Sequence, residues 1–148
     1  MKKIIPAKNL LDFYKKGLFP MAENFDSEFI NLYQPKKRFI IPIDNFHVPK
    51  KLFKLFRKNT YTFKINNNFK NVISKCQLAN RKDNGTWINN IILDSYLNLH
   101  YEKIAHSVEC YDQNQLIVDY TEYILVDVFL EKVCLVNFRT QANFVYFI

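Results

Sequence analysis

Helical and strand-like patterns alternate along this chain, and the alternation predicts an α/β domain. Between Ile88 and Leu99, apolar residues recur every three or four positions, as on one face of an amphipathic helix. Residues 61–65 alternate apolar and polar side chains, as in a strand. The length of 148 residues is that of one domain, and an apolar content of 49% is sufficient for a core. We therefore expect a single α/β domain.

Two short helices are expected in the first part of the chain. The first begins near Leu10 and ends at Gly17, after which Pro20 prevents its continuation. The second follows Pro49 and reaches Lys58, with apolar residues on one side and cations on the others. A solvated face is the ordinary explanation of such a charge run, and contact with RNA phosphates is the alternative.

A strand and a helix are expected next. The strand at 61–65 is followed by three asparagines at 66–68, which suit a turn and a helix cap. The helix pattern begins at Phe69 and includes Cys76.

Beyond the helix at 88–99, the polarity pattern changes to that of a strand. Residues 105–110 alternate imperfectly, and the helical pattern is broken just before them. Residues 120–130 and 144–148 are rich in β-formers and are expected to make strands.

The charge is positive and unevenly distributed, with a net value of +7. Residues 1–117 hold 19 lysines and arginines against 10 acids, whereas residues 118–148 hold two against four. The basic first part favours a polyanionic partner.

Composition also restricts the location and the cofactors. The sequence has no run of about 18 apolar residues and no secretory signal, so we expect a cytosolic protein. Cys76, Cys110 and Cys134 lie far apart, with no Cys-x-x-Cys and no histidine at metal-ligand spacing. We expect free, reduced and mostly buried thiols and no metal site.

Three side chains between 85 and 109 could carry chemistry. Trp87 opens a helix pattern, where tryptophan is more often a core anchor than a ligand platform. His106 is also more often structural in such a position, because a histidine beside a serine is more often a hydrogen-bonded structural group than a catalytic base. His106 and Glu109 are three positions apart in an expected strand, so they should lie on opposite faces and have structural roles.

The motifs of this stretch are specific. Residues 85–88 read Gly-Thr-Trp-Ile, residues 95–100 read Ser-Tyr-Leu-Asn-Leu-His, and residues 105–109 read Ala-His-Ser-Val-Glu. They resemble the leucyl/phenylalanyl-tRNA protein transferase family, whose members carry Gly-Thr-Trp-Ile, an Ala-Tyr-x-x-Leu-His helix and Ala-His-Ser-x-Glu. The resemblance is continuous from about Leu10 to Ile117. It implies an α/β fold with a mixed sheet and helices, of acetyltransferase-like architecture and incomplete at the carboxyl end.

The resemblance implies two residues for the 3′ end of an aminoacyl-tRNA. Trp87 is the better candidate. Met21 follows the family pattern Leu-x-x-x-Tyr-x-x-Gly-x-Phe-Pro, after which members place Trp or Met near the terminal adenosine. A methionine that fills a core gap is the alternative for Met21.

A second family pattern, Trp-Trp-Ser-Pro-x-x-Arg followed by a strand, is matched in part. Pro35 and Arg38 match, and the apolar run at 39–42 fits the strand, but the tryptophans are replaced by Leu32 and Tyr33. Candidate contacts to tRNA phosphates are the cations around this pattern and in the second helix: Lys36, Lys37, Arg38, Lys50, Lys51, Arg57 and Lys58.

The implied reaction is an acyl transfer. The family moves Leu or Phe from the 3′ ester of aminoacyl-tRNA to the α-amine of a protein that begins with Arg or Lys, which marks that protein for degradation. No metal or organic cofactor is implied. The family's Gly-Glu-Ser-Met-Phe and Asp-x-Gln motifs have no counterpart here, so we assign no catalytic residue.

The resemblance stops after Ile117, where the family continues Gly-Gly-Leu-Tyr-Gly. If the residues from Val118 onward are written in permitted codons and read in another frame, they give Gly-Leu-Tyr-Gly and then Phe-Phe-Gly-Glu-Ser-Met-Phe-Ser. We therefore hypothesise that residues 1–117 are a family-like amino-terminal part and that residues 118–148 are an out-of-frame tail.

Such a molecule is expected to be inactive as a transferase, and a non-catalytic tRNA-binding remnant is the alternative. A general acetyltransferase would need a glycine-rich loop for coenzyme A, which a chain with two glycines does not offer.

Overall fold

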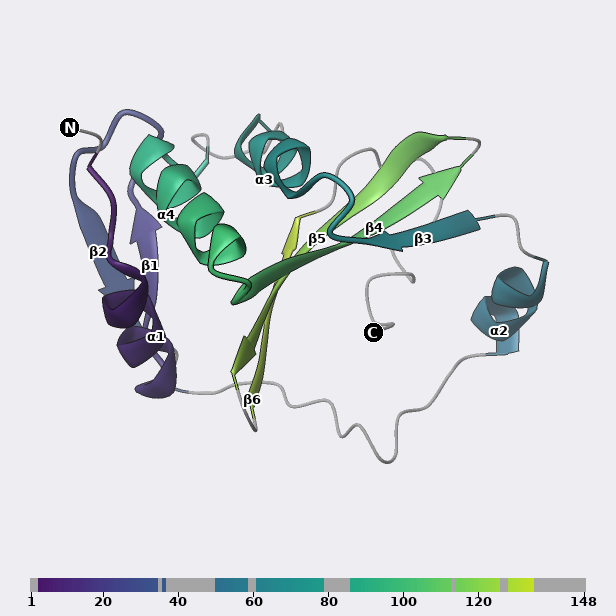
Figure 1. Ribbon diagram of the computed structural model, residues 1–148, viewed down its shortest axis with the longest axis horizontal. Coiled ribbons are helices and arrows are strands. Elements are labelled where there is room, and N and C mark those ends of the chain that lie inside the picture. The colour runs from purple at the N-terminus through teal and green to yellow at the C-terminus, as the bar shows by residue number, and fades with distance from the viewer. Residues whose placement is uncertain are drawn as a thin grey trace.

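A computed structural model describes residues 3–34, 36, 50–58, 61–78, 86–112, 114–125 and 128–134 of the chain. Helices and strands alternate in these parts, so the predicted α/β class is confirmed (Figure 1). The elements in chain order are α1 (Ala7–Lys15), β1 (Phe19–Ala22), β2 (Ile30–Tyr33), α2 (Lys50–Arg57), β3 (Tyr61–Ile65), α3 (Phe69–Leu78), α4 (Asn90–Tyr101), β4 (Ala105–Asp112), β5 (Gln115–Leu125) and β6 (Val128–Cys134).

Two sheets organise the fold. β1 and β2 form a hairpin, and the larger sheet has the order β3-β4-β5-β6. Figure 1 shows α3 and α4 over one face of the larger sheet, with α1 and the hairpin beside α4 and with α2 at the opposite end. Every strand pairing in the described residues is antiparallel, so the parallel pair that a mixed sheet requires is not among them.

The first helix ends as its sequence predicts. Gly17 has φ 72°, in the left-handed region where glycine lacks the steric penalty of other residues. The helix ends at Lys15, and Pro20, which was expected to prevent its continuation, lies inside β1; the β1–β2 hairpin was not predicted. Four-residue strands carry too few alternating positions to be recognised in a sequence.

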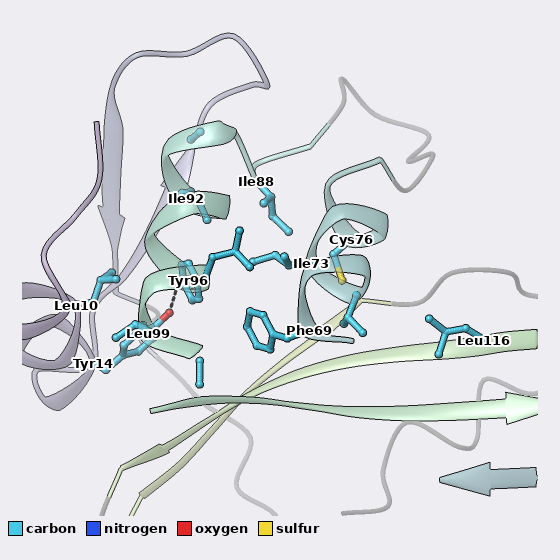
Figure 2. Packing of buried hydrophobic residues seen from close by; sticks show 14 residues of the cluster. Leu10, Tyr14, Phe69, Ile73, Cys76, Ile88, Ile92, Tyr96, Leu99 and Leu116 are labelled. Atoms are coloured by element: carbon cyan, nitrogen blue, oxygen red, sulfur yellow. Dashed lines mark hydrogen bonds between the residues drawn. The ribbon is translucent and has the colours of Figure 1, made fainter. Parts of the chain in front are cut away.

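The core lies between the helices and the sheet (Figure 2). Leu10 of α1, Val72 of α3 and Leu99 of α4 are each fully buried, because the helical spacing of apolar residues turns one face of each helix inward. Ile88 is buried too, although α4 begins after it, at Asn90.

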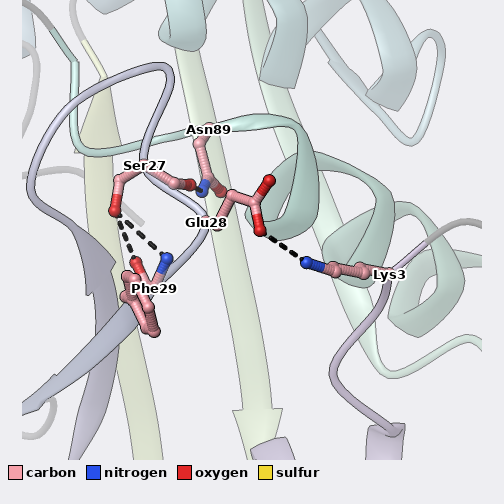
Figure 3. Close-up of polar contacts among 5 residues, drawn as sticks. All are labelled: Lys3, Ser27, Glu28, Phe29 and Asn89. Atoms are coloured by element: carbon pink, nitrogen blue, oxygen red, sulfur yellow. Dashed lines mark hydrogen bonds and ion pairs between the residues drawn. The ribbon is translucent and has the colours of Figure 1, made fainter.

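Asn89 joins the start of α4 to the β1–β2 loop. Its Oδ1 accepts a hydrogen bond from the backbone N–H of Ile92 at 2.9 Å, which caps the helix. Its Nδ2 donates to the carbonyl oxygen of Ser27 at 2.6 Å (Figure 3). The buried amide of Asn89 thus provides a hydrogen-bond acceptor for the end of the helix and a donor for a carbonyl of the loop.

Replacing Asn89 by alanine is expected to lower the free energy of unfolding by about 1–2 kcal/mol, because the helix loses its cap and the carbonyl of Ser27 loses a donor. Chemical denaturation checks this value. Asn89→Ser is the matched control, since its hydroxyl oxygen can still cap the helix but the amide donor to Ser27 is removed without adding a charge. A serine variant as unstable as the alanine variant would show that the loop contact, and not the cap, carries the effect.

The middle of the chain follows its predicted pattern closely. The strand at 61–65, the asparagine turn and the helix from Phe69 are all present. Asn66 has φ 55°, which asparagine tolerates well, and Oδ1 of Asn68 accepts from the N–H of Asn71 at 3.1 Å as a helix cap.

The strand expected at 105–110 is also confirmed, as β4. β5 and β6 account for the expected strand at 120–130, whereas residues 39–42 and 144–148 lie outside the described residues. The β4–β5 register has an irregularity: Cys110 pairs with Val118 and Tyr111 with Leu116, so Ile117 is an extra residue in a β-bulge.

Candidate functional site

Trp87 and Met21 come from distant parts of the chain, and the structure brings their segments together. The backbone N–H of Ala22 donates to the carbonyl oxygen of Trp87 at 3.0 Å, so the end of β1 is joined to the segment that leads into α4. Met21 is half-buried between Pro20 and Ala22, which are both buried. The two candidates for the 3′ end therefore lie on backbone segments that are hydrogen-bonded to each other.

The turn around Trp87 is fixed on both sides. Thr86 is buried, and its Oγ1 accepts from the N–H of Ile88 at 3.1 Å, after which Asn89 caps α4. Trp87 itself is half-buried and packs against the core. It thus serves as a core anchor, and part of the residue remains exposed to solvent.

A pair of stacked aromatic rings lies on the same face of the hairpin as Met21. Phe19 and Met21 share one face of β1, and their register partners on β2 are Tyr33 and Asn31. The rings of Phe19 and Tyr33 stack with centroids 6.4 Å apart and planes at 29°. Tyr33 stands where the family has a tryptophan, and the sequence alone gave no signal that Phe19 would be its partner.

The candidate phosphate contacts on α2 lie apart from the segments of Trp87 and Met21 (Figure 1). Lys36 is exposed, and so are Lys50, Lys51, Arg57 and Lys58 on or next to α2. Figure 1 shows α2 at the end of the molecule opposite β1. Lys37 and Arg38 lie outside the described residues.

His106 and Glu109 lie on opposite faces of β4, as their spacing predicts. Nδ1 of His106 is 2.8 Å from Nδ2 of Asn66, on the partly exposed side. Glu109 is fully buried on the other side. Because the two side chains lie on opposite faces of the strand, they cannot act together as an acid–base pair.

Glu109 holds the start of α3 in place. Its carboxylate accepts from the N–H of Asn68 at 2.7 Å, from Oγ of Ser107 at 2.9 Å and from the hydroxyl of Tyr111 at 2.5 Å. Burial raises the pKa of Glu109, but the hydrogen bonds from Tyr111, Asn68, Ser107 and Asn67 outweigh it, so the pKa lies below its ordinary value. The negative charge also faces the amino-terminal end of α3, where the helix dipole favours it.

The histidine of the Leu-His motif is also held by the fold. Nδ1 of His100 donates to the carbonyl oxygen of Ala105 at 2.8 Å, and its ring stacks on Phe69 with centroids 4.2 Å apart and planes at 7°. This contact joins the end of α4 to the start of β4. The geometry suits packing better than proton transfer.

The thiols agree with the sequence expectation as far as the structure describes them. Cys76 and Cys110 are both buried, and burial raises the pKa of Cys110 to about 11, so it is a poor nucleophile at neutral pH. In the described residues, no group of three or more histidines, cysteines or acids could hold a metal ion. Within the same segments, no helix is both long and apolar enough to cross a bilayer.

The sequence is similar to one family of enzymes. A profile described as "Leucyl/phenylalanyl-tRNA protein transferase" matches residues 40–130. Proteins named leucyl/phenylalanyl-tRNA protein transferase are 40% identical over 111 residues in Maricaulis maris, 37% over 111 residues in Phenylobacterium zucineum and 37% over 110 residues in Hyphomonas neptunium.

These alignments cover 75%, 75% and 74% of this chain but 51%, 50% and 43% of the respective relatives. The chain thus spans about half the length of the curated relatives it matches. The matched profile ends 13 residues after Ile117, inside β6.

Proposed function

This chain belongs to the leucyl/phenylalanyl-tRNA protein transferase family, and from that premise we propose that it binds the 3′ end of an aminoacyl-tRNA in an aminoacyl transfer to protein. The observation that carries the proposal is the backbone hydrogen bond from Ala22 to Trp87, because it joins the segment of Met21 to that of Trp87. An indole that is only half-buried is suited to stacking on the terminal adenine.

The proposed reaction needs little from the protein beyond positioning. The ester of aminoacyl-tRNA is already activated, so the enzyme has to align it with the attacking amine, keep that amine neutral and stabilise the oxyanion. An α-amino group has a pKa of about 8, so a useful fraction is neutral near physiological pH. We propose no metal or organic cofactor for this step.

The finer details of the substrates are also proposals. Family resemblance supports Leu or Phe as the transferred residue and an amino-terminal Arg or Lys on the acceptor, with degradation of the tagged protein as the outcome. Both substrates are cytosolic molecules, so we propose a cytosolic location.

The basic residues are proposed to contact the tRNA backbone away from its 3′ end. Lys50, Lys51, Arg57 and Lys58 are exposed, as phosphate contacts must be. Their distance from β1 in Figure 1 fits a large polyanion that touches two separate parts of the molecule. Binding should then weaken steeply with added salt.

We retain the proposal that residues 118–148 are an out-of-frame tail on a family-like part at 1–117. Two observations bear on it: the β4–β5 register shifts at Ile117, and the family profile continues to residue 130. Sequencing the gene across codon 117 and downstream decides whether residues 118–148 are an out-of-frame tail or part of the family's reading frame. An intact frame that leads into Gly-Glu-Ser-Met-Phe overturns the tail proposal and restores a complete acceptor site.

The Trp87 site is tested by binding and by transfer. Trp87→Ala is expected to weaken binding of leucyl-tRNA by about 5- to 150-fold, which corresponds to the loss of one aromatic stack of about 1–3 kcal/mol. Trp87→Phe keeps a ring and should retain most of the affinity. Filter binding gives the affinities, and a thermal melt of each variant shows that the fold is intact.

Transfer of labelled leucine to a peptide with amino-terminal arginine separates the two candidate functions. Transfer by the wild-type chain supports the enzyme, and salt-dependent binding without transfer supports the non-catalytic tRNA-binding alternative. An alanine variant that binds leucyl-tRNA as tightly as the wild type would remove Trp87 from the site.

A further inference from the structure

Three phenylalanine rings lie exposed where α2 meets β3. Phe53 and Phe56 of α2 are 52% and 60% exposed, and Phe63 of β3 is 41% exposed. The rings of Phe56 and Phe63 are 6.4 Å apart at 38°, so helix and strand present a shared aromatic surface. None of the three belongs to the buried core.

Cations surround these rings. Residues 50–58 contain Lys50, Lys51, Lys54, Arg57 and Lys58 and no acid. The guanidinium carbon of Arg57 lies 6.0 Å from the centroid of the Phe53 ring. We call the three rings and these five cations the aromatic–basic patch.

The composition of the patch fits one class of ligand. Exposed aromatic rings offer faces for stacking, and interleaved cations neutralise phosphates. Bases in duplex RNA are already stacked on one another, whereas bases in a single strand are free to stack on a side chain. The chemistry therefore matches a single strand of RNA.

A lipid surface is a poorer match. An interfacial helix needs a continuous apolar face, separate from its cations, that can enter the acyl region. Here the guanidinium carbon of Arg57 lies 6.0 Å from the centroid of the Phe53 ring, and the Phe56 ring is 6.4 Å from Phe63 of β3, so a cation and a strand contact the rings that would have to enter the acyl region.

We propose that the aromatic–basic patch is a second RNA-binding surface, which stacks single-stranded bases on Phe53 and Phe56 and contacts phosphates through the cations of α2. The proposal rests on the proposed function for RNA as the class of partner. It goes beyond that function by adding a stacking surface that is separate from Trp87 and does not require the aminoacyl group.

The experiment measures fluorescence anisotropy of a labelled single-stranded oligouridylate and of an RNA duplex of the same length. Phe53→Ala/Phe56→Ala is expected to weaken single-strand binding by about fivefold or more and to leave duplex binding unchanged, because only stacking is removed. Lys50→Ala/Lys51→Ala should weaken the binding of both RNAs and reduce the salt dependence of that binding between about 50 and 200 mM salt.

Phe29→Ala is the matched control. Phe29 is 80% exposed but lies in the β1–β2 loop, away from α2 in Figure 1. Its removal should change neither affinity. Circular dichroism melts of the variants confirm that they fold, as expected for replacements of exposed rings.

Two outcomes overturn the proposal. One is a double phenylalanine variant that binds the oligouridylate as the wild type does. The other is a variant that keeps RNA binding but no longer binds phosphatidylserine vesicles, which would assign the patch to a membrane. Failure of the proposed function is read separately, because oligouridylate carries no amino acid and leucine transfer is measured with Trp87 variants.

Discussion

Glu109→Leu is expected to lower the free energy of unfolding by about 3 kcal/mol, because one buried donor and two part-buried donors lose a charged acceptor at about 1–3 kcal/mol each. The donors are the N–H of Asn68 and the hydroxyls of Ser107 and Tyr111. Leucine offers them no acceptor and stays in the same buried space. Urea denaturation at neutral pH gives the value.

The same carboxylate predicts how stability depends on acid. Since the folded pKa of Glu109 lies below the ordinary value of 4.5, the charged form is favoured by folding. The contribution is therefore complete above about pH 4.5 and is lost as the pH falls through the folded pKa. Acid titration of the wild type should show this loss.

Glu109→Gln is the matched control for both measurements. Its amide oxygen can still accept, but its NH₂ group meets donors, so the variant should be intermediate in stability at neutral pH. It should also lack the part of the acid dependence that comes from Glu109. A glutamine variant with the wild-type acid profile would mean that other carboxylates cause the loss.

These contacts explain the Ala-His-Ser-x-Glu motif as a structural device. The N–H of Ser107 donates to Oδ1 of Asn66 at 3.0 Å, and the N–H of Asn66 donates to the carbonyl of Ser107 at 2.9 Å. Ser107 and Glu109 together hold the β3–α3 turn. The spacing alone predicted opposite faces for His106 and Glu109, but the partners, about 40 residues away in the chain, could not be read from a local pattern.

Local patterns predicted most elements because each depends on residues near one another. Helix α4 was recognised from the spacing between Ile88 and Leu99, and the asparagines before Phe69 indicated both a turn and a cap. The hairpin of β1 and β2 was missed since each strand has four residues and β1 contains Pro20.

In the candidate site, too, the residues within local motifs were predicted, whereas the contacts between distant segments were not. Family resemblance indicates Trp87 and Met21, and the structure adds the backbone hydrogen bond from Ala22 to Trp87 that joins their segments. The stacked pair of Phe19 and Tyr33 was not predicted, because it depends on the hairpin register.

Tyr96→Ala is expected to lower the free energy of unfolding by about 3–5 kcal/mol, the usual range for removing a buried aromatic ring. Tyr96 of α4 and Tyr14 of α1 are both buried, and their hydroxyls are hydrogen-bonded to each other (Figure 2). Each belongs to a motif of the family, so two motifs from distant parts of the chain meet in one contact. Thermal and urea denaturation measure the loss.

A double-mutant cycle separates the hydroxyl contact from ring packing. Tyr14→Phe and Tyr96→Phe should each cost about 1–2 kcal/mol, and the double variant should cost less than their sum, because the second change removes a hydroxyl that has already lost its partner. Additive losses would show that the two hydroxyls do not stabilise the fold through each other.

Alkaline pH gives an independent measurement of the same pair. Burial raises the pKa of both phenols above the ordinary value of 10.0. Stability is therefore complete below about pH 10 and falls as the pH rises toward the folded pKa values, since the unfolded chain releases these protons first. The double phenylalanine variant should lose this part of the alkaline dependence.

The tyrosine pair also bears on the proposed site, because α1 leads through Gly17 into β1 and so fixes where Met21 meets the Trp87 segment. If the pair positions β1, Tyr14→Phe should weaken binding of leucyl-tRNA at temperatures where the variant is fully folded. Binding of oligouridylate at α2 should be unchanged in the same variant. Equal weakening of both ligands would instead indicate a general loss of structure, and no change in either would separate the pair from the site.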